Sequence, residues 1–501
     1  MYRAVVARNA VSRQRQDQPA LPGWVAVPVV AALASLLLLI IALTPAQHLP
    51  GAALAYVNLL IICGAAVYFL REGTLQGLIP VIFLTWLAAA WPLASIYFAT
   101  RFPTAVYTTL AEDREFLFRN TWLQAVTLLF LVCYLTALFL LRGRYPAWSS
   151  SAGSLRDDRR AATIVLCIAM SAITLHAVSK VAAFPELLQY TADGGFIFLH
   201  SLILMVGVLF LRLPLPTRCW ALLFMVFAGA FYTIGNARGQ AALPMTLLLI
   251  GLIFLSDLDL RWKVGIVSVV VVGFPLGLVI SNTTRLVTQT IGFVDLATRL
   301  KALQQWQEVL TDTPVLASTF GRLFFTGGHS VVTLSPERYP YVDFSWTKYL
   351  WEFVMRVLPR KFFYDPYYSS NPNVLLRKYD FIITDETSTP LSLIGGLYVL
   401  GGVVPVMVGG LFLGAYHALF GRLIARLNRA SKHMALLVFA LTGTHLLWAQ
   451  NLDLITHVRG TIWAAASGIA LYLVVIRPFL GLPVRGRRVL VRRRRLMARP
   501  A

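Results

Sequence analysis

The chain has 501 residues, of which 58% are hydrophobic and only 13% are charged, and its mean hydropathy is +0.70. This composition excludes a soluble globular protein, because such proteins carry about 25% charged residues. The formal net charge of +22 comes from 44 Lys and Arg against 22 Asp and Glu.

The first predicted element is a membrane helix behind a basic tail. Residues 1–23 carry four arginines, and the run from Trp24 to Leu43 has no charged residue. A membrane span needs about 20 apolar residues, so this run is long enough to cross. The run is longer than the core of a signal peptide, and its leader is long. We therefore expect a retained anchor and a tail in the cytoplasm.

Residues 24–281 predict nine membrane helices, and residues 390–479 predict three more. The expected spans are 24–44, 52–70, 77–99, 121–141, 161–183, 195–211, 219–235, 241–256, 264–281, 390–416, 434–450 and 461–479. We expect the four cysteines in these runs to be small core residues rather than disulfide partners or metal ligands, because they show no CxxC spacing. They are Cys63, Cys133, Cys167 and Cys219.

Few polar residues interrupt the spans. No Asp or Glu lies in the middle of a predicted helix, whereas His176, His200 and His445 do lie within helices. A proton-coupled carrier usually keeps a carboxylate or a charge relay in the membrane, so this pattern disfavours a transporter without excluding it. The histidines fit hydrogen bonds between helices, and His176 and His200 also fit the lining of a cavity open to the outside.

A short turn between two of these helices contains an arginine. Arg238 lies in the segment Gly235-Asn-Ala-Arg-Gly-Gln240. The turn falls on the side of the membrane where basic residues are rare, at the level of the lipid headgroups. A guanidinium there matches phosphate oxygens with two parallel hydrogen bonds, so Arg238 is a candidate phosphate ligand.

Residues 282–389 form a loop much longer than an ordinary connection, and loops of this length usually have a function. The loop is rich in aromatic residues, and segments such as Tyr349–Leu358 carry apolar residues at helical spacing. We expect it to fold into short amphipathic helices that lie over a cavity among the membrane helices. Its basic residues alternate with aromatic ones, which suits phosphates and sugar rings respectively. Ordinary surface charge is the alternative for any one of them.

The distribution of basic residues predicts the topology. With twelve spans, both termini lie on one side, and most Lys and Arg of the short connecting segments fall on that side. The short segments on the other side contain five arginines, and Lys180 lies near a helix end. Cytoplasmic loops carry the excess of basic residues, so we expect both termini in the cytoplasm and residues 282–389 outside. The five arginines are Arg101, Arg114, Arg119, Arg238 and Arg459.

The C-terminal tail, residues 480–501, contains the run Arg492-Arg-Arg-Arg495. In a soluble protein such a run would indicate nucleic-acid binding. Directly after a membrane helix it instead suits orientation of the chain and contact with anionic lipids, so we expect no nucleic-acid partner.

The acidic residues do not predict a metal site. Asp257 and Asp259 resemble the carboxylate pair of many glycosyltransferases, but the charge rule places them in the cytoplasm, where a solvated turn is expected. Glu112 and Asp113 fall in the second external loop, where a solvated amphipathic turn is expected and a metal-binding pair is the alternative. The sequence contains no HExxH, P-loop or nucleophile elbow.

Three segments are similar to one family. The turn Asn236-Ala-Arg-Gly-Gln240, the segment Trp351–Phe363 late in the long loop, and the segment Thr387–Tyr398 with its following glycines resemble the Wzy-type O-antigen and exopolysaccharide polymerases. The resemblance covers most of the chain as an architecture. It implies an all-α integral membrane protein with a glycosyltransferase architecture of the GT-C type. O-antigen ligases share this layout.

The resemblance implies transfer of a growing glycan from undecaprenyl diphosphate to a hydroxyl of the next lipid-linked repeat, on the external face of the bacterial inner membrane. Diphosphate is a good leaving group, so cations must stabilise its charge and one base must accept the hydroxyl proton. The expected diphosphate ligands are Arg238, Arg360 and Lys361, with Arg322 and Arg356 in reserve. The expected base is Glu386, Asp385 or His329.

This interpretation requires no cofactor and no metal. Its partners are the lipid-linked oligosaccharide, membrane lipids and, by resemblance to the family, a protein that regulates chain length. Two alternative functions remain open: an O-antigen ligase-type transferase, and a flippase or transporter of lipid-linked sugars.

Overall fold

The computed structural model describes the larger part of the membrane helices of this chain. The described residues are 23–44, 46–88, 92–93, 95–96, 99, 114–143, 148, 154–181, 199–234, 246–259, 261–266, 268, 393–399, 401–448 and 454–481.

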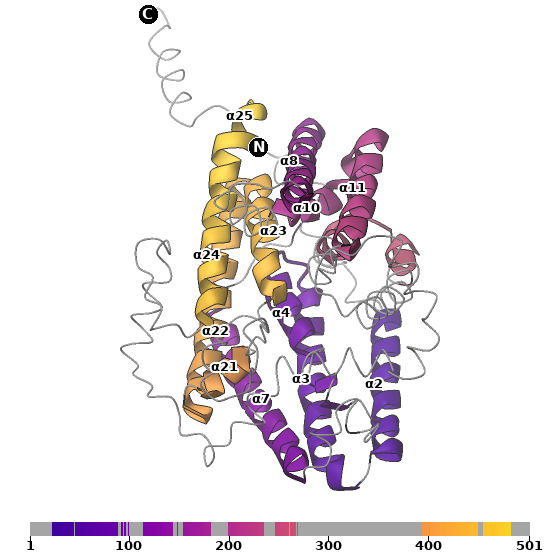
Figure 1. Ribbon diagram of the computed structural model, residues 1–501, viewed down its shortest axis with the longest axis vertical. Helices are drawn as coiled ribbons and strands as arrows, with labels where there is room; N and C mark the ends of the chain where they lie inside the picture. The colour runs from indigo at the N-terminus through magenta and orange to yellow at the C-terminus, as the bar shows by residue number, and fades with distance from the viewer. Residues whose placement is uncertain are drawn as a thin grey trace, which may run out of the picture.

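All regular secondary structure in these residues is helical (Figure 1). The longer helices are α2 (Gly23–Leu43), α3 (Leu49–Arg71), α4 (Leu78–Ala88), α7 (Arg114–Leu141), α8 (Leu155–Val181), α11 (Leu215–Ile234), α22 (Val403–Ala430), α23 (Lys432–Trp448) and α24 (Leu454–Leu471). The shorter elements are η1 (Ala46–His48), α10 (Ile203–Leu209), η3 (Phe210–Arg212), η4 (Gly251–Leu255), α21 (Leu393–Val399), η7 (Tyr472–Ile476) and α25 (Arg477–Phe479).

Within this described part, four helical segments are long and apolar enough to cross a membrane. They are Leu49–Arg71, Asn120–Leu141, Val403–Ala430 and His457–Phe479. Each has 22 to 28 residues, and a rise of about 1.5 Å per residue gives lengths above the hydrocarbon thickness of about 30 Å. An all-helical membrane fold follows, because a helix satisfies its own backbone hydrogen bonds where no water is present.

One predicted span is broken in two. The sequence predicts a continuous helix over 390–416, whereas the structure ends α21 at Val399 and begins α22 at Val403. The reason is Gly402, whose φ of 75° is a backbone conformation that glycine adopts without steric cost. Its N–H donates to the Tyr398 carbonyl over 2.6 Å and closes the first helix. The long span therefore starts later and extends to Ala430.

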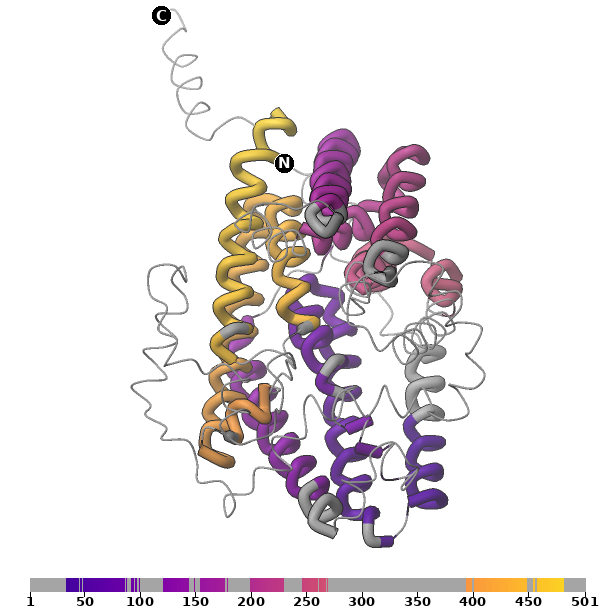
Figure 2. Tube along the Cα trace, viewed as in Figure 1, coloured from indigo at the N-terminus to yellow at the C-terminus, as the bar shows by residue number. Residues whose placement is uncertain are grey.

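Three helices that are distant in the sequence run parallel to one another. Figure 2 shows indigo α3 and purple α7 side by side in the lower part of the molecule, and orange α22 begins beside α7 and continues toward the upper part. Contacts between α3 and α7 join Asn58 to Gln124 near their middles and Glu72 to Arg142 just beyond their ends. Contacts between α7 and α22 join Tyr134 to His417 and Leu141 to Arg422. In each pair of helices, the residue numbers of the contacts increase together, so the three helices run in the same direction.

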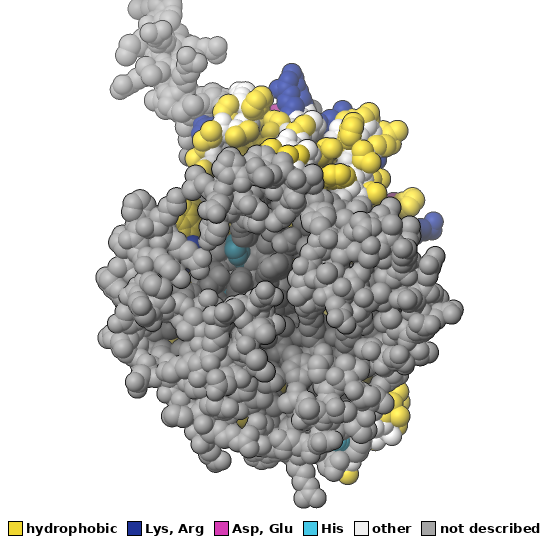
Figure 3. Space-filling model, in the orientation of Figure 1, with side chains coloured by type: hydrophobic (Ala, Val, Ile, Leu, Met, Phe, Trp, Pro, Cys, Tyr) yellow, Lys and Arg dark blue, Asp and Glu magenta, His cyan; other side chains and the backbone are white. Residues whose placement is uncertain are grey.

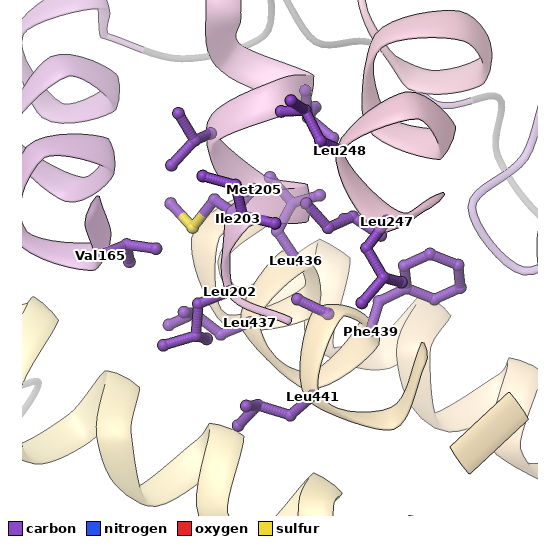
Figure 4. Packing of buried hydrophobic residues seen from close by; sticks show 14 of the residues in the cluster. Val165, Leu202, Ile203, Met205, Leu247, Leu248, Leu436, Leu437, Phe439 and Leu441 are labelled. Atoms are coloured by element: carbon purple, nitrogen blue, oxygen red, sulfur yellow. The ribbon is translucent and has the colours of Figure 1, made fainter. Parts of the chain in front are cut away.

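The buried residues form two apolar clusters. The first lies among α8, α10, α11, α23 and the segment 246–255, and Figure 4 shows Leu202, Met205, Leu247 and Leu436 meeting in it. The second lies among α3, α4, α7, α21 and the first half of α22. α22 belongs to both, because Leu413 packs in the second cluster and Ile424 in the first. The middle of α22 is therefore one place where the two clusters join.

Large apolar side chains also cover exposed helix faces. Figure 3 shows them in yellow at the end of the molecule that carries α8, α11 and α25. Val226 on α11 is 69% exposed and Val474 in η7 is 73% exposed. Such faces suit lipid rather than water. The expectation that all four cysteines are core residues is wrong for Cys167 and Cys219, which are exposed, whereas Cys133 is buried.

Candidate functional site

The predicted catalytic and diphosphate-binding residues all lie outside the described residues. These are Arg238, Arg322, His329, Arg356, Arg360, Lys361, Asp385 and Glu386. Glu112 and Asp113 lie outside them as well. The geometry of this external site therefore stays a prediction.

The described helices contain a polar site that the sequence did not predict. It is centred on His417 of α22 and His457 of α24, and it includes Tyr134 of α7 and the backbone of His445 of α23. His417 is 2% exposed, and Tyr134 and His457 are 0% exposed. We call these four residues the histidine chain. It connects four helices at the junction of the two apolar clusters.

Close packing of α22 on α7 places His417 next to Tyr134. A Cβ atom on Gly410 would lie 2.9 Å from the Phe130 carbonyl oxygen, and one on Gly414 would collide with the Tyr134 carbonyl. Glycines four residues apart allow two helix backbones to approach in this way. His417 follows Gly414 by three residues, so it lies on the same face of α22.

The distances in the histidine chain are those of hydrogen bonds. The Tyr134 hydroxyl oxygen lies 2.8 Å from Nδ1 of His417. The two Nε2 atoms of His417 and His457 lie 3.2 Å apart, and Nδ1 of His457 lies 3.1 Å from the backbone oxygen of His445. Every ring nitrogen of the two buried histidines thus faces one polar atom.

Aromatic rings enclose the chain. Phe83 of α4 lies edge-on to His417, with ring centroids 5.3 Å apart. Tyr416 packs against both histidine rings, while its own hydroxyl is bound to Thr461 instead of a histidine. Among the described residues, the surroundings of the two rings exclude water and include no negatively charged group in contact with them.

A sequence pattern could have found His417. Gly410, Gly414 and His417 share one helix face inside an uncharged run, which is the combination of small and polar residues typical of helix contacts in membranes. His457 gave no such sign, because it lies in Asn451-Leu-Asp-Leu-Ile-Thr-His, before the predicted span at 461. Of the histidines singled out from the sequence, His445 joins the chain through its backbone, whereas His200 is buried elsewhere, beside Phe224.

A second polar group lies along the first half of α7. The Ser95 hydroxyl donates to Asn120 over 2.7 Å, and the Asn58 amide donates to the side chain of Gln124 over 3.1 Å. The indole N–H of Trp122 donates to the Tyr398 hydroxyl over 2.9 Å. That last bond connects α7 to α21, the helix that begins soon after the long loop.

A buried carboxylate forms the third group. Asp158 of α8 is completely buried and pairs with Arg212, with Lys432 at 3.0 Å and with His433 at 2.7 Å. Burial alone would raise the pKa of Asp158. The hydrogen bonds and charges of His433 and Lys432 outweigh burial, so the pKa lies below its ordinary value of 3.8. This group holds three helical segments together as a structural ion-pair cluster.

No three potential metal-ligating residues come together among the residues that the structure describes. Asp257 and Asp259 are both exposed, in the turn that leads into residues 261–266, as expected for a solvated turn. The backbone oxygen of Asp259 accepts from the N–H groups of Trp262 and Lys263 and thereby starts that helix.

In comparisons with known proteins, no family model, no curated protein and no solved structure matches the chain.

Proposed function

We propose that this protein polymerises lipid-linked oligosaccharide repeat units at the external face of the bacterial inner membrane. The observation that carries the proposal is the 108-residue segment 282–389, which is rich in aromatic and basic residues and lies between membrane helices. The proposed architecture has about twelve spans, both termini in the cytoplasm and this segment as an external cap of the GT-C type.

The described helices support a site near the start of α7. Glu386 precedes the first residue of α21, Leu393, by seven residues, and seven residues span at most about 25 Å. The proposed base Glu386 is therefore within that distance of the start of α21 along the chain, and Tyr398, five residues further on, bonds to Trp122 of α7. The parallel course of α3, α7 and α22 also fits the proposed topology. These helices correspond to even-numbered spans, each of which would run from the outside to the cytoplasm.

The proposed reaction needs two kinds of group. The acceptor hydroxyl oxygen forms a bond to the anomeric carbon of the donor glycan, while the bond from that carbon to undecaprenyl diphosphate breaks. The diphosphate leaves with the electron pair, and Arg238, Arg360 and Lys361 stabilise its charge, with Arg322 and Arg356 nearby. The hydroxyl proton passes to Glu386, Asp385 or His329. Holding two lipid-bound headgroups side by side provides most of the remaining rate increase.

The proposal is tested by polymer-length analysis in a strain that lacks the gene. We expect the Arg238→Ala variant to make single repeats in place of long chains, at unchanged protein level. The Arg101→Ala variant is the matched control, because Arg101 also lies in a short external loop but outside the resemblance. We expect Arg238→Lys to stay defective, since lysine cannot form the paired hydrogen bonds of a guanidinium.

Three outcomes would contradict the proposal. Full-length chains from Arg238→Ala would remove that residue from the phosphate site. Polymer that forms normally in the deletion strain but is not attached to its final acceptor would indicate a ligase. Repeat units that accumulate on the inner leaflet of the deletion strain would indicate a flippase.

A further inference from the structure

The histidine chain has a proton arrangement that its geometry determines. It has a start, the Tyr134 hydroxyl, and an end, the backbone oxygen of His445, with two imidazole rings between them. Each contact is a hydrogen bond, so each must contain one donor and one acceptor. This condition determines the donor and the acceptor of every contact in the chain.

The carbonyl of His445 determines which nitrogen of His457 carries the proton. A backbone carbonyl has no hydrogen, so Nδ1 of His457 carries the proton and donates it. In a neutral imidazole the other nitrogen is then an acceptor, so Nε2 of His417 carries a proton and donates to Nε2 of His457. Nδ1 of His417 is left as an acceptor, and the Tyr134 hydroxyl donates to it. The two rings are therefore opposite tautomers.

The neutral state follows from what surrounds the rings. Within the described part of the chain, the groups that face them are Tyr134 of α7, Phe83 of α4, Tyr416 of α22, the backbone of His445 of α23 and, on α24, Thr461 next to Tyr416. None of these carries a negative charge, and the nearest charged side chain of α24, Arg459, is cationic. A buried imidazolium without a counter-ion is costly. A second proton on His457 would also oppose two N–H groups across 3.2 Å.

We infer that Tyr134, His417 and His457 form a neutral hydrogen-bond chain in which each residue donates to the next. The chain holds α7, α22 and α24 against the end of α23, and it does not conduct protons. A relay must pass its proton to a group that can release it, whereas this chain ends on an amide carbonyl. The inference concerns the membrane core and is independent of the proposed polymerase site. It also removes this histidine pair as the proton relay of a transporter.

Solid-state NMR of the full-length protein in lipid bilayers, with ¹⁵N-labelled histidine, tests the inference directly. Signals are assigned with the His417→Asn and His457→Asn variants. We expect an Nε2–H tautomer for His417 and an Nδ1–H tautomer for His457. Both rings should be neutral at pH 7. Identical tautomers, or a positive charge on either ring at pH 7, would overturn the inference.

Two tyrosines provide a matched pair of variants. Tyr134→Phe removes the donor to Nδ1 of His417. Tyr416→Phe removes a hydroxyl that is bound to Thr461 and keeps an aromatic ring packed beside that of His417. We expect only Tyr134→Phe to shift the Nδ1 signal of His417, and we expect it to lower the thermal midpoint. An unchanged Nδ1 signal in Tyr134→Phe would overturn the chain. If that variant does not fold, the tautomers of the unmodified protein decide alone.

Discussion

At the residue scale, Asp158 shows how one side chain can organise a protein with few charges. Its carboxylate lies in the first turn of α8, where the helix dipole favours a negative charge. Arg212 comes from η3, and Lys432 and His433 begin α23. One buried anion thus joins three segments that are far apart in the sequence, at the end of the helices where the charge distribution predicts the cytoplasm.

We predict that Asp158→Asn lowers the free energy of unfolding by about 3–5 kcal/mol, the usual cost of removing one partner from a buried ion pair. Asp157→Asn is the control, because Asp157 is half-buried and forms no ion pair with the residues that the structure describes. Thermal unfolding of the two purified variants in detergent checks this. Equal midpoints would show that the cluster adds nothing to stability.

The same carboxylate predicts a pH dependence. Because the pKa of Asp158 is lower in the folded than in the unfolded protein, its contribution to stability is fully present at neutral pH. It declines as the pH falls below the ordinary value of 3.8 and is lost once the pH falls through the folded pKa. Unfolding midpoints measured from pH 7 to pH 3 should fall more steeply for the unmodified protein than for Asp158→Asn. Parallel curves would contradict the assignment.

At the element scale, α22 connects the two apolar clusters and carries His417. Its position on α7 depends on glycine at 410 and 414, since a side chain at either position meets the backbone of α7. The same helix begins only after the break at Gly402, which separates it from α21. A continuous helix from 390 would give α22 a different course relative to α7.

We predict that Gly414→Val separates α22 from α7 and destabilises the protein by about 1–3 kcal/mol, the usual cost of overpacking. Gly64→Ala is the control, because a Cβ atom at position 64 of α3 meets nothing within 4 Å. Alanine there should be neutral or slightly stabilising, since it favours a helix over glycine. Thermal unfolding of both variants tests this, and a Gly414→Val variant as stable as the unmodified protein would show that the helices do not pack closely.

At the scale of the whole molecule, the central question is which side of the membrane carries residues 282–389. The charge distribution predicts that this segment lies outside and that both termini lie inside. The exposed apolar faces of α11 and η7 fit a lipid environment, and four helical segments of the described part can cross it. The orientation itself remains a prediction that accessibility measurements can decide.

We predict that Ser369→Cys, in the long segment, reacts with a membrane-impermeant thiol reagent in intact spheroplasts, and that Ala498→Cys, in the basic tail, reacts only after lysis. Both variants are made in a background without native cysteines, because Cys167 and Cys219 are exposed and would add signal. Labelling of Ser369→Cys only after lysis would place the segment in the cytoplasm and contradict the proposed external site.

The sequence by itself determined the class of this protein, because uncharged runs of about 20 residues have few stable alternatives to a membrane helix. It also indicated where most helices lie: the predicted spans 52–70 and 121–141 fall within α3 and α7. Local composition is sufficient for these features, since each depends on residues that are neighbours in the chain.

Only the tertiary structure decided which helices meet and what they enclose. Tyr134 and His417 are separated by 283 residues, and Asp158 and His433 by 275. No local pattern encodes such pairs, because they depend on how glycine faces, apolar surfaces and isolated polar groups fit between whole helices. The break at Gly402 was missed for a related reason: two glycines within an apolar run suit a continuous helix or a turn, and packing against neighbouring helices selects between them.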